Sequence, residues 1–244
     1  MNLLSTRVAK LSVVQCKDDE ALRGGIGSAL CAMSSPLCEC LARAPVNDGN
    51  LTSLYGGDLI FSIDGVLGAE EASRLVAFGE SAGFVTQLHE ADEVVTYRHN
   101  DRLAIVDESF AAALWTRLCR HMPRVLGMEP VGCSSNIRLY KYSKGMRFGR
   151  HVDGSHADSR GNLSQYTVLI YLNDSSHCAL RGGATAFYAG QYSDADVEKS
   201  QVLCFEPRRG TALLHGHGER CLLHEGCEVT NGIKYVLRTD IMYA

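Results

Sequence analysis

The segment YSKGMRFGRHVDG, residues 142–154, contains the most informative triplet of this chain, His151-Val152-Asp153. Two residues spaced i and i+2 on an extended strand project from the same face, so His151 and Asp153 can hold one ion together. A histidine from a distant strand would complete a set of two imidazoles and one carboxylate, and His224 is the candidate. Such a set leaves about three positions of an octahedral iron open. The triplet alone is weak evidence for a metal site, because such triplets often arise by chance. The surrounding sequence must therefore show whether it binds a metal.

The composition is that of an ordinary globular protein. The chain has 244 residues, of which 45% are hydrophobic and 21% charged, which fits one large domain or one domain plus an extension. A net charge of -4 argues against a protein that tracks phosphates, and no apolar run reaches the roughly 18 residues that span a bilayer. We therefore expect neither a nucleic-acid partner nor a membrane.

The ten cysteines are scattered along the chain, and no secretory signal is recognisable. A chain of this length can build its own core, so free thiols in a reducing, cytoplasmic compartment are the favoured interpretation.

The sequence divides into an extension and one domain. Residues 1–55 are poor in aromatic residues and are interrupted by Pro36 and Pro45, so we expect a variable, partly disordered extension. Order is expected to begin at the strand-like run 59–63, which opens a domain over residues 56–244. Helical spacing of apolar residues over 69–78 and 108–119 predicts helices in the region 64–125.

From Val131 onward the sequence consists of short extended segments separated by turn residues. Eight short strands without a long helix between them predict a double-sheet barrel or jelly roll in residues 131–244, and hence a mainly β fold with flanking helices (α+β). The expected strands are Ser135–Tyr142, Phe148–Val152, Gln165–Leu172, Ala184–Phe187, Ser200–Phe205, Thr211–Leu214, Cys221–His224 and Lys234–Met242.

Several segments together resemble a known family. Residues 142–154 are similar to the segment that carries the first metal ligands in 2-oxoglutarate- and Fe(II)-dependent oxygenases of the prolyl 4-hydroxylase type. The next two strands of that family resemble YTVLIYLN (166–173) and GGATAF (182–187), and its closing segment resembles PRRGTALL (207–214), LHEG (223–226) and GIKYVLR (232–238). The resemblance runs from about residue 58 to the C-terminus, and its order and spacing are far more specific than the triplet.

This resemblance implies a double-stranded β-helix core in which His151, Asp153 and His224 hold Fe(II). It implies 2-oxoglutarate and O₂ as cosubstrates and ascorbate as the reductant that keeps the iron reduced. The implied reaction is hydroxylation of a C–H bond, with release of succinate and CO₂.

The family places a cation for the C5 carboxylate of 2-oxoglutarate on the strand after the distal histidine. Lys234, ten residues beyond His224, matches that position. The resemblance implies that the hydroxyls of Tyr142, Tyr171 and Thr185 are the partners of Lys234. Arg238 is a competitor, because four residues further along a strand it shares a face with Lys234. We prefer Lys234 and expect Arg238 to form an ion pair, for instance with Asp240.

Two polar groups allow alternative interpretations. Arg98, Asn100 and Arg102 lie either in a solvated loop or at the mouth of the site, where they would bind polar groups of the substrate. His215 and His217 could form an alternative zinc site with His224, but no suitable general base accompanies them. We expect them instead to line the loop that leads into the distal ligand strand.

The substrate is the least constrained part. A prolyl residue of a protein or peptide is the leading hypothesis, on family resemblance alone, and a free amino acid or another small metabolite is the alternative. A hypothesis of a different class is a non-catalytic module that binds metal or 2-oxoglutarate. The sequence does not indicate the oligomeric state.

Overall fold

The structure is a computed structural model that describes residues 35–41, 49–91, 96–190 and 197–244. The chain divides into two units, Met1–Met33 and Ser34–Ala244, and all the described residues belong to the second. Most of the expected extension over residues 1–55 lies outside the described residues, so that expectation stays a prediction.

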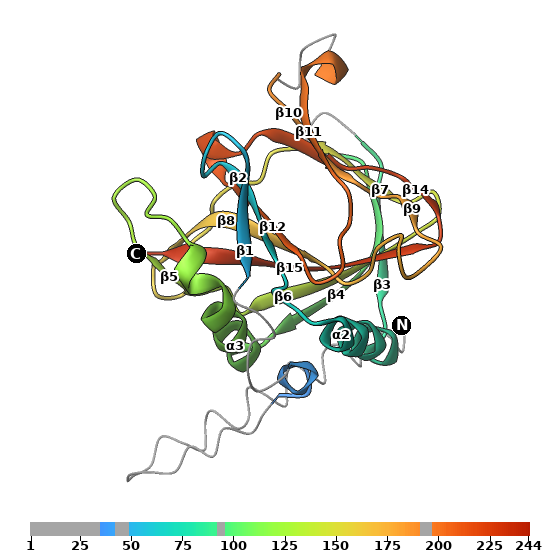
Figure 1. Ribbon diagram of the computed structural model, residues 1–244, viewed down its shortest axis with the longest axis horizontal. Helices are drawn as coiled ribbons and strands as arrows, with labels where there is room; N and C mark the ends of the chain where they lie inside the picture. Colours follow the sequence, from blue (N-terminus) through green and yellow to red (C-terminus); the bar gives the residue numbers. More distant parts are fainter. Residues whose placement is uncertain (1–34, 42–48, 92–95, 191–196) are drawn as a thin grey trace. The chain divides into compact units, whose positions relative to one another are not determined.

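The strands form one continuous antiparallel sheet that curls into a nearly closed barrel (Figure 1). Its larger half contains, in spatial order, β1 (Asn50–Tyr55), β2 (Ile60–Asp64), β12 (Ala212–Gly216), β8 (Leu163–Tyr171), β15 (Ile233–Tyr243), β6 (Asn136–Ser143) and β4 (Arg98–Val106). The smaller half continues with β7 (Arg147–His151), β13 (Leu223–Gly226), β10 (Thr185–Tyr188) and β11 (Gln201–Phe205). This is the double-stranded β-helix, and the predicted fold class is confirmed.

Shorter elements complete the fold. Strand β3 (Val85–His89) extends the sheet beside β4, and β5 (Pro130–Cys133) pairs with β15. A separate two-stranded sheet is made of β9 (Arg181–Gly182) and β14 (Val229–Asn231). Short 3-10 turns cover Cys38–Cys40, Cys119–His121, Val197–Ser200 and Gly218–Arg220.

Successive side chains of a strand point alternately into the barrel and away from it, and this produces two separate apolar clusters. On β8, Val168 and Ile170 face outward, whereas Tyr171 belongs to the cluster inside the barrel. On β15, the neighbours Val236 and Leu237 divide in the same way. Because successive side chains of a strand point to opposite faces, one sheet supplies both the barrel interior and the surface on which the helices pack.

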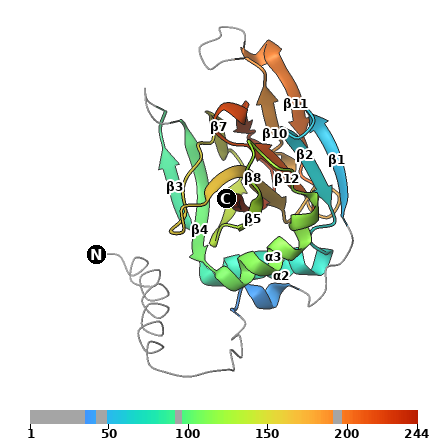
Figure 2. The same ribbon diagram turned by 90° about the vertical axis from the view of Figure 1, so that its left-hand side faces the viewer.

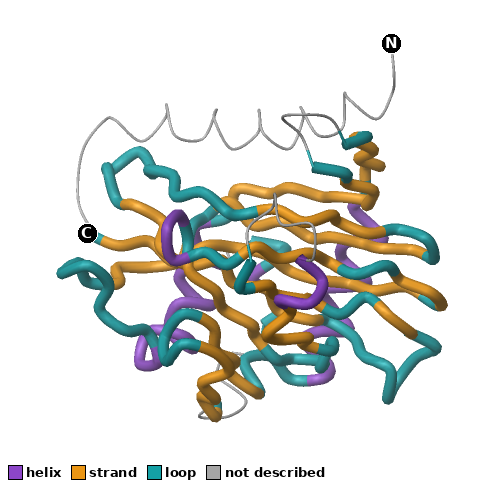
Figure 3. The backbone as a smooth tube through the Cα atoms, turned by 90° about the horizontal axis from the view of Figure 1, so that it is seen from above, coloured by secondary structure: helices purple, strands orange, loops and turns teal. Residues whose placement is uncertain are grey.

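Two helices cover the outer face of the larger half (Figure 2). They are α2 (Ala69–Ala82) and α3 (Glu108–Leu118), which contribute Leu75 and Leu114 to the outer cluster. The Asp107 side chain accepts a hydrogen bond from the Phe110 amide at 2.8 Å and so caps α3. Figure 3 shows the strands of the barrel running alongside one another.

A buried ion pair joins the two helices. The Arg117 guanidinium donates to both Glu71 carboxylate oxygens at 2.8 and 2.9 Å, and it also donates to the Val66 carbonyl. The Glu71 side chain in addition accepts a hydrogen bond from the Gly68 amide at the start of α2.

We expect Glu71→Gln to lower the free energy of unfolding by about 3–5 kcal/mol, because it leaves the buried Arg117 charge without its carboxylate. Glu70→Gln is the matched control on the same helix, since Glu70 is 92% exposed in its pair with Arg74, and it should change stability little. Urea denaturation followed by circular dichroism measures both. Equal stability of the two variants would contradict this role of the ion pair.

All eight predicted strands are present, within a few residues of their expected ends. The region 64–125, expected to hold helices, also contains β3 and β4. Residues 98–102, for which a solvated loop was one of two interpretations, are part of β4. The inward positions of β4 carry polar side chains in place of apolar ones, so the strand lacked the usual alternation. Residues 50–55, assigned to the extension, form β1 and pair with β2.

Among the described residues, no helix has the length and apolar character needed to cross a bilayer. Every cysteine in that part of the chain is a free thiol.

Candidate metal and cosubstrate site

The structure brings His151, Asp153 and His224 together. His151 ends β7 and pairs in register with His224 on the neighbouring β13, and Asp153 follows two residues later. One potential ligand atom from each residue lies within 4.8 Å of the other two. The Asp153 carboxylate is 3.6 Å from His151 Nε2 and 3.8 Å from His224 Nε2.

The orientation of both imidazoles is held by backbone carbonyls. Nδ1 of His151 lies 2.8 Å from the Gly149 carbonyl oxygen, and Nδ1 of His224 lies 2.9 Å from that of Leu222. Because a carbonyl can only accept, each Nδ1 carries the proton and each Nε2 keeps a lone pair. Burial lowers the pKa of His151 to about 3 and also lowers the pKa of His224. Both rings are therefore neutral, which is the form that binds metals.

Asp153 is held as a carboxylate. Its Oδ2 atom accepts hydrogen bonds from Thr167 Oγ1 at 2.7 Å and from the Arg238 guanidinium at 3.0 Å. Burial alone would raise the pKa of Asp153, but Arg238 and the nearby imidazoles hold it well below its usual value. Since Oδ2 is engaged in this way, Oδ1 remains for an ion. Two neutral imidazoles and one carboxylate fit a divalent iron.

A second polar group inside the barrel surrounds Lys234. This side chain is 5% exposed, and its Nζ atom lies 5.4 Å from the ring centroids of both Tyr142 and Tyr171. The Tyr171 and Thr185 hydroxyls are 2.7 Å apart. Burial lowers the pKa of Lys234 to about 8.

Gly183 makes room for this lysine. Lys234 Nζ donates to the Gly183 carbonyl at 2.5 Å. Gly183 has φ +76°, and a Cβ added there would lie 3.0 Å from Lys234 Cδ. Gly182 also has a positive φ, so this glycine pair both turns the chain and allows the close approach of Lys234.

Arg238 occupies a different place from Lys234. Its guanidinium contacts Asp153 at 3.0 Å and lies 3.7 Å from Asp240, so the expected ion pair with Asp240 is present. Among the described residues, no carboxylate pairs with Lys234. Lys234 thus remains available to a carboxylate, whereas Arg238 already contacts Asp153 and Asp240.

The inward face of β4 carries Arg98, Asn100 and Arg102. The Arg98 guanidinium lies 4.1 Å over the Phe148 ring, and that ring stacks on His151 with centroids 3.8 Å apart. Asn100 is fully buried beside the Tyr142 hydroxyl, and neither of its amide atoms makes a hydrogen bond of good geometry. These three residues therefore line the barrel interior near the metal ligands.

Arg138 joins this group, although the sequence analysis did not select it. On β6 it pairs in register with Arg238, and its inward position follows from its spacing with Tyr140. Burial lowers the pKa of Arg102, and the charges of Arg138, Arg98 and Arg238 add to that effect. Among the described residues, no carboxylate lies within ion-pair distance of Arg98 or Arg102.

His215 lies in β12 and not in the loop where we expected it. It is 1% exposed, and its Nε2 atom lies 3.8 Å from Asp153 Oδ2. His217 follows the strand, and its ring contacts the Thr167 hydroxyl at 2.8 Å and the Ser164 hydroxyl at 3.1 Å. The expectation of a loop position was wrong for His215, because its inward orientation depends on the register of β12.

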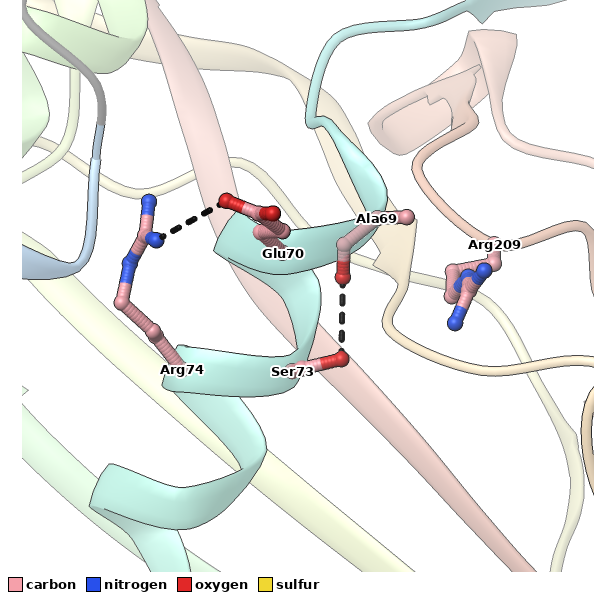
Figure 4. A pocket seen from close by; sticks show the side chains of 5 residues that line it. All are labelled: Ala69, Glu70, Ser73, Arg74 and Arg209. Atoms are coloured by element: carbon pink, nitrogen blue, oxygen red, sulfur yellow. Dashed lines mark hydrogen bonds and ion pairs between the residues drawn. The ribbon is translucent and has the colours of Figure 1, made fainter.

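A shallow pocket also opens at the start of α2 (Figure 4). Within it Glu70 pairs with Arg74 at 3.7 Å, and the Ser73 hydroxyl donates to the Ala69 carbonyl. None of the predicted site residues lines this pocket.

The comparisons with known proteins agree with this geometry. Residues 137–239 match the family model described as the 2OG-Fe(II) oxygenase superfamily, and this range includes all three candidate ligands. No curated protein matches the chain in sequence.

Solved structures share the fold. A viral collagen prolyl hydroxylase from Paramecium Bursaria Chlorella virus-1, in complex with 2OG, is 16% identical, with a TM-score of 0.50 over 76% of this chain and 97% of that chain. A prolyl hydroxylase from Trichoplax adhaerens, in complex with a peptide of hypoxia inducible factor, is 20% identical, with a TM-score of 0.52 over 76% and 84%. The epimerase SnoN from nogalamycin biosynthesis is 13% identical, with a TM-score of 0.52 over 76% and 78%.

The fold and the matched segment define a non-heme iron oxygenase. Residues 137–239 resemble the 2OG-Fe(II) oxygenase superfamily, and the chain is a 2-oxoglutarate-dependent dioxygenase that resembles the prolyl 4-hydroxylases.

Proposed function

We propose that this enzyme hydroxylates a prolyl residue of a protein or peptide and releases succinate and CO₂. The convergence of His151, Asp153 and His224 is the observation that supports oxygenase chemistry, and the same sheet holds a buried lysine, Lys234. The prolyl substrate rests on likeness to prolyl hydroxylases and is an analogy. Because an epimerase shares the fold, the fold alone leaves the substrate open.

In this proposal His151 and His224 would hold Fe(II) through their Nε2 atoms, and Asp153 would hold it through its carboxylate. When bound, the iron supplies the activation of O₂ that oxidises 2-oxoglutarate and the substrate C–H bond. Thr167 and Arg238 hold the second oxygen of Asp153, which keeps the carboxylate oriented and ionised. Ascorbate serves as the reductant.

Lys234 would bind the C5 carboxylate of 2-oxoglutarate. It presents a compact charge, and the Tyr142 and Tyr171 rings beside it exclude water and strengthen the ion pair. The Tyr171 and Thr185 hydroxyls are placed to donate to the same carboxylate. Arg238, already engaged with Asp153, would act through that ligand instead.

The arginines of the barrel interior favour a substrate that carries a negative charge. Four guanidinium groups (Arg98, Arg102, Arg138 and Arg238) face two carboxylates, Asp153 and Asp240. Buried charges without partners are costly, and arginine binds carboxylates in a bidentate manner. We therefore propose that Arg98, Asn100 and Arg102 bind a carboxylate next to the hydroxylated carbon. This observation also favours a second candidate function, hydroxylation of a free amino acid.

Two peptides that differ in one charge test the proposed carboxylate contact. A peptide with Glu beside the proline should show added oxygen by mass spectrometry more readily than its Gln counterpart, and free L-proline tests the second candidate. Arg102→Gln should raise KM for the Glu peptide about tenfold, equivalent to about 1.4 kcal/mol, and leave the Gln peptide unaffected. Arg74→Gln, on the outer helix α2, is the control. Equal losses on both peptides would rule out the carboxylate contact, and absence of oxygen in every substrate would rule out prolyl hydroxylation.

A further inference from the structure

We propose that His217 is a positioning residue for the metal ligand Asp153, and that it acts through the hydroxyl of Thr167. The inference rests on the proposed function, because it concerns the same metal site. His217 belongs to neither of the two groups of potential metal ligands found among the described residues. It is nevertheless only 3% exposed and makes polar contacts at both ring nitrogens, so its burial calls for an explanation.

The Thr167 hydroxyl has one proton and two close acceptors for it. Its Oγ1 atom lies 2.7 Å from Asp153 Oδ2 and 2.8 Å from His217 Nε2. A carboxylate is the stronger acceptor, and without this proton two oxygen lone pairs would face each other. The hydroxyl therefore donates to Asp153, and His217 Nε2 must donate to Thr167. Asp240 is too distant to compete, at 3.5 Å from Thr167 Oγ1 and 3.8 Å from His217 Nε2.

The second ring nitrogen of His217 fits this assignment. Burial lowers the pKa of His217, so the ring is neutral, and with the proton on Nε2 its Nδ1 carries a lone pair. Nδ1 lies 3.1 Å from the Ser164 hydroxyl, which can donate to it. The Ser164 carbonyl would favour a proton on Nδ1, but it lies further away, at 3.3 Å, and already accepts from the Ser155 hydroxyl.

Ser164 extends this chain of hydrogen bonds to the surface. Its Oγ atom accepts from the His156 amide at 2.9 Å and also lies 2.9 Å from His156 Nδ1. Since Ser164 gives its proton to His217, the Nδ1 atom of His156 must be a donor. The His156 side chain is 43% exposed. The chain therefore runs from the solvent through two buried hydroxyls to Asp153, and every proton in it points toward this ligand.

This direction keeps one oxygen of Asp153 away from the metal. Oδ2 is held by the Thr167 hydroxyl and by the Arg238 guanidinium, so the carboxylate is expected to offer the ion one oxygen and not both. Two imidazoles and one carboxylate oxygen leave about three positions of an octahedral iron open, enough for 2-oxoglutarate and O₂. His217 would thus help to keep the site open without being a ligand.

Nitrogen-15 NMR of the histidine-labelled full chain tests the direction of the hydrogen bonds. Among the nine histidines, we expect His217 to carry its proton on Nε2, whereas His151 and His224 carry theirs on Nδ1. His217→Gln assigns the His217 signals by removing them. A proton on Nδ1 of His217 in the wild type would overturn the proposal.

Mn(II) affinity, measured by isothermal titration, tests whether His217 acts through Thr167. Loss of a supporting contact weakens metal sites by about 10–100-fold, so we expect about tenfold weaker binding in His217→Phe and in Thr167→Val. His217→Gln keeps an N–H group for Thr167 and should bind Mn(II) like the wild type. The double variant should bind no more weakly than Thr167→Val alone. His177→Phe, at an imidazole that is 51% exposed, is the control.

Additive losses in the double variant, or equal losses in His217→Gln and His217→Phe, would show a purely structural role and overturn the proposal. Circular dichroism checks that each variant keeps the fold. Asp153→Ala separates this inference from the proposed function, because unchanged Mn(II) affinity in that variant would contradict the metal site itself. If Asp153→Ala loses Mn(II) and the Thr167 and His217 variants do not, this inference alone fails.

Discussion

Asp153→Ala is expected to abolish tight metal binding while the β fold survives. The variant removes the only negative charge among the three proposed ligands, and the residue lies beyond the end of β7, outside the sheet ladder. Since loss of a mere supporting contact weakens metal sites by 10–100-fold, loss of this ligand should weaken Mn(II) binding by more than about 100-fold. Isothermal titration with Mn(II) measures the affinity, and circular dichroism checks the fold.

Asp158→Ala is the matched control for this variant. Asp158 lies in the same loop region and accepts hydrogen bonds from the Arg160 and Asn162 amides. Its loss should leave Mn(II) affinity unchanged. An Asp153→Ala protein that bound Mn(II) as tightly as the wild type would show that the metal lies elsewhere.

Lys234→Met is expected to weaken 2-oxoglutarate binding by about 100-fold. Truncating one partner of a buried charge pair costs about 2–5 kcal/mol, and each 1.4 kcal/mol corresponds to a factor of ten. Arg238→Met should instead weaken metal binding, because Arg238 contacts Asp153. Titration of the Mn(II)-loaded variants with 2-oxoglutarate separates the two roles. A larger loss of 2-oxoglutarate affinity in Arg238→Met would assign the C5 carboxylate to Arg238.

The pH dependence of this binding provides a control for the charge. Burial lowers the pKa of Lys234 to about 8, so the amine is protonated below that pH and neutral above it. The dianionic cosubstrate needs the protonated form, and its Kd should therefore rise above pH 8, by up to about tenfold per pH unit. A Lys234→Arg variant, whose guanidinium stays charged, should show no such rise.

The jelly-roll strands could be predicted because they are short, largely apolar segments separated by turn residues. Strands such as β8 and β15 place apolar residues on both faces, and such apolar segments can be recognised in the sequence alone. The order of His151, Asp153, His224 and Lys234 was likewise readable from spacing and resemblance. Strand β4 was not, because its inward positions carry Arg98, Asn100 and Arg102, which read as a polar loop.

The remaining site residues were hidden by sheet register. Thr167 and His215 are partners across β8 and β12, and Arg138 and Arg238 are partners across β6 and β15. These residues are far apart in the chain, and a shift of one residue would turn each side chain to the opposite face. The contacts of Thr167, His215 and Arg238 with Asp153 therefore became visible only in three dimensions. The same holds for the ion pair between Arg138 and Asp240.

A crystal structure of the chain grown anaerobically with Mn(II) and 2-oxoglutarate tests the central claim most directly. The account predicts an anomalous peak bonded to His151 Nε2, Asp153 Oδ1 and His224 Nε2, with the C5 carboxylate of 2-oxoglutarate on Lys234. A metal bound elsewhere, or 2-oxoglutarate absent from the barrel interior, would contradict it.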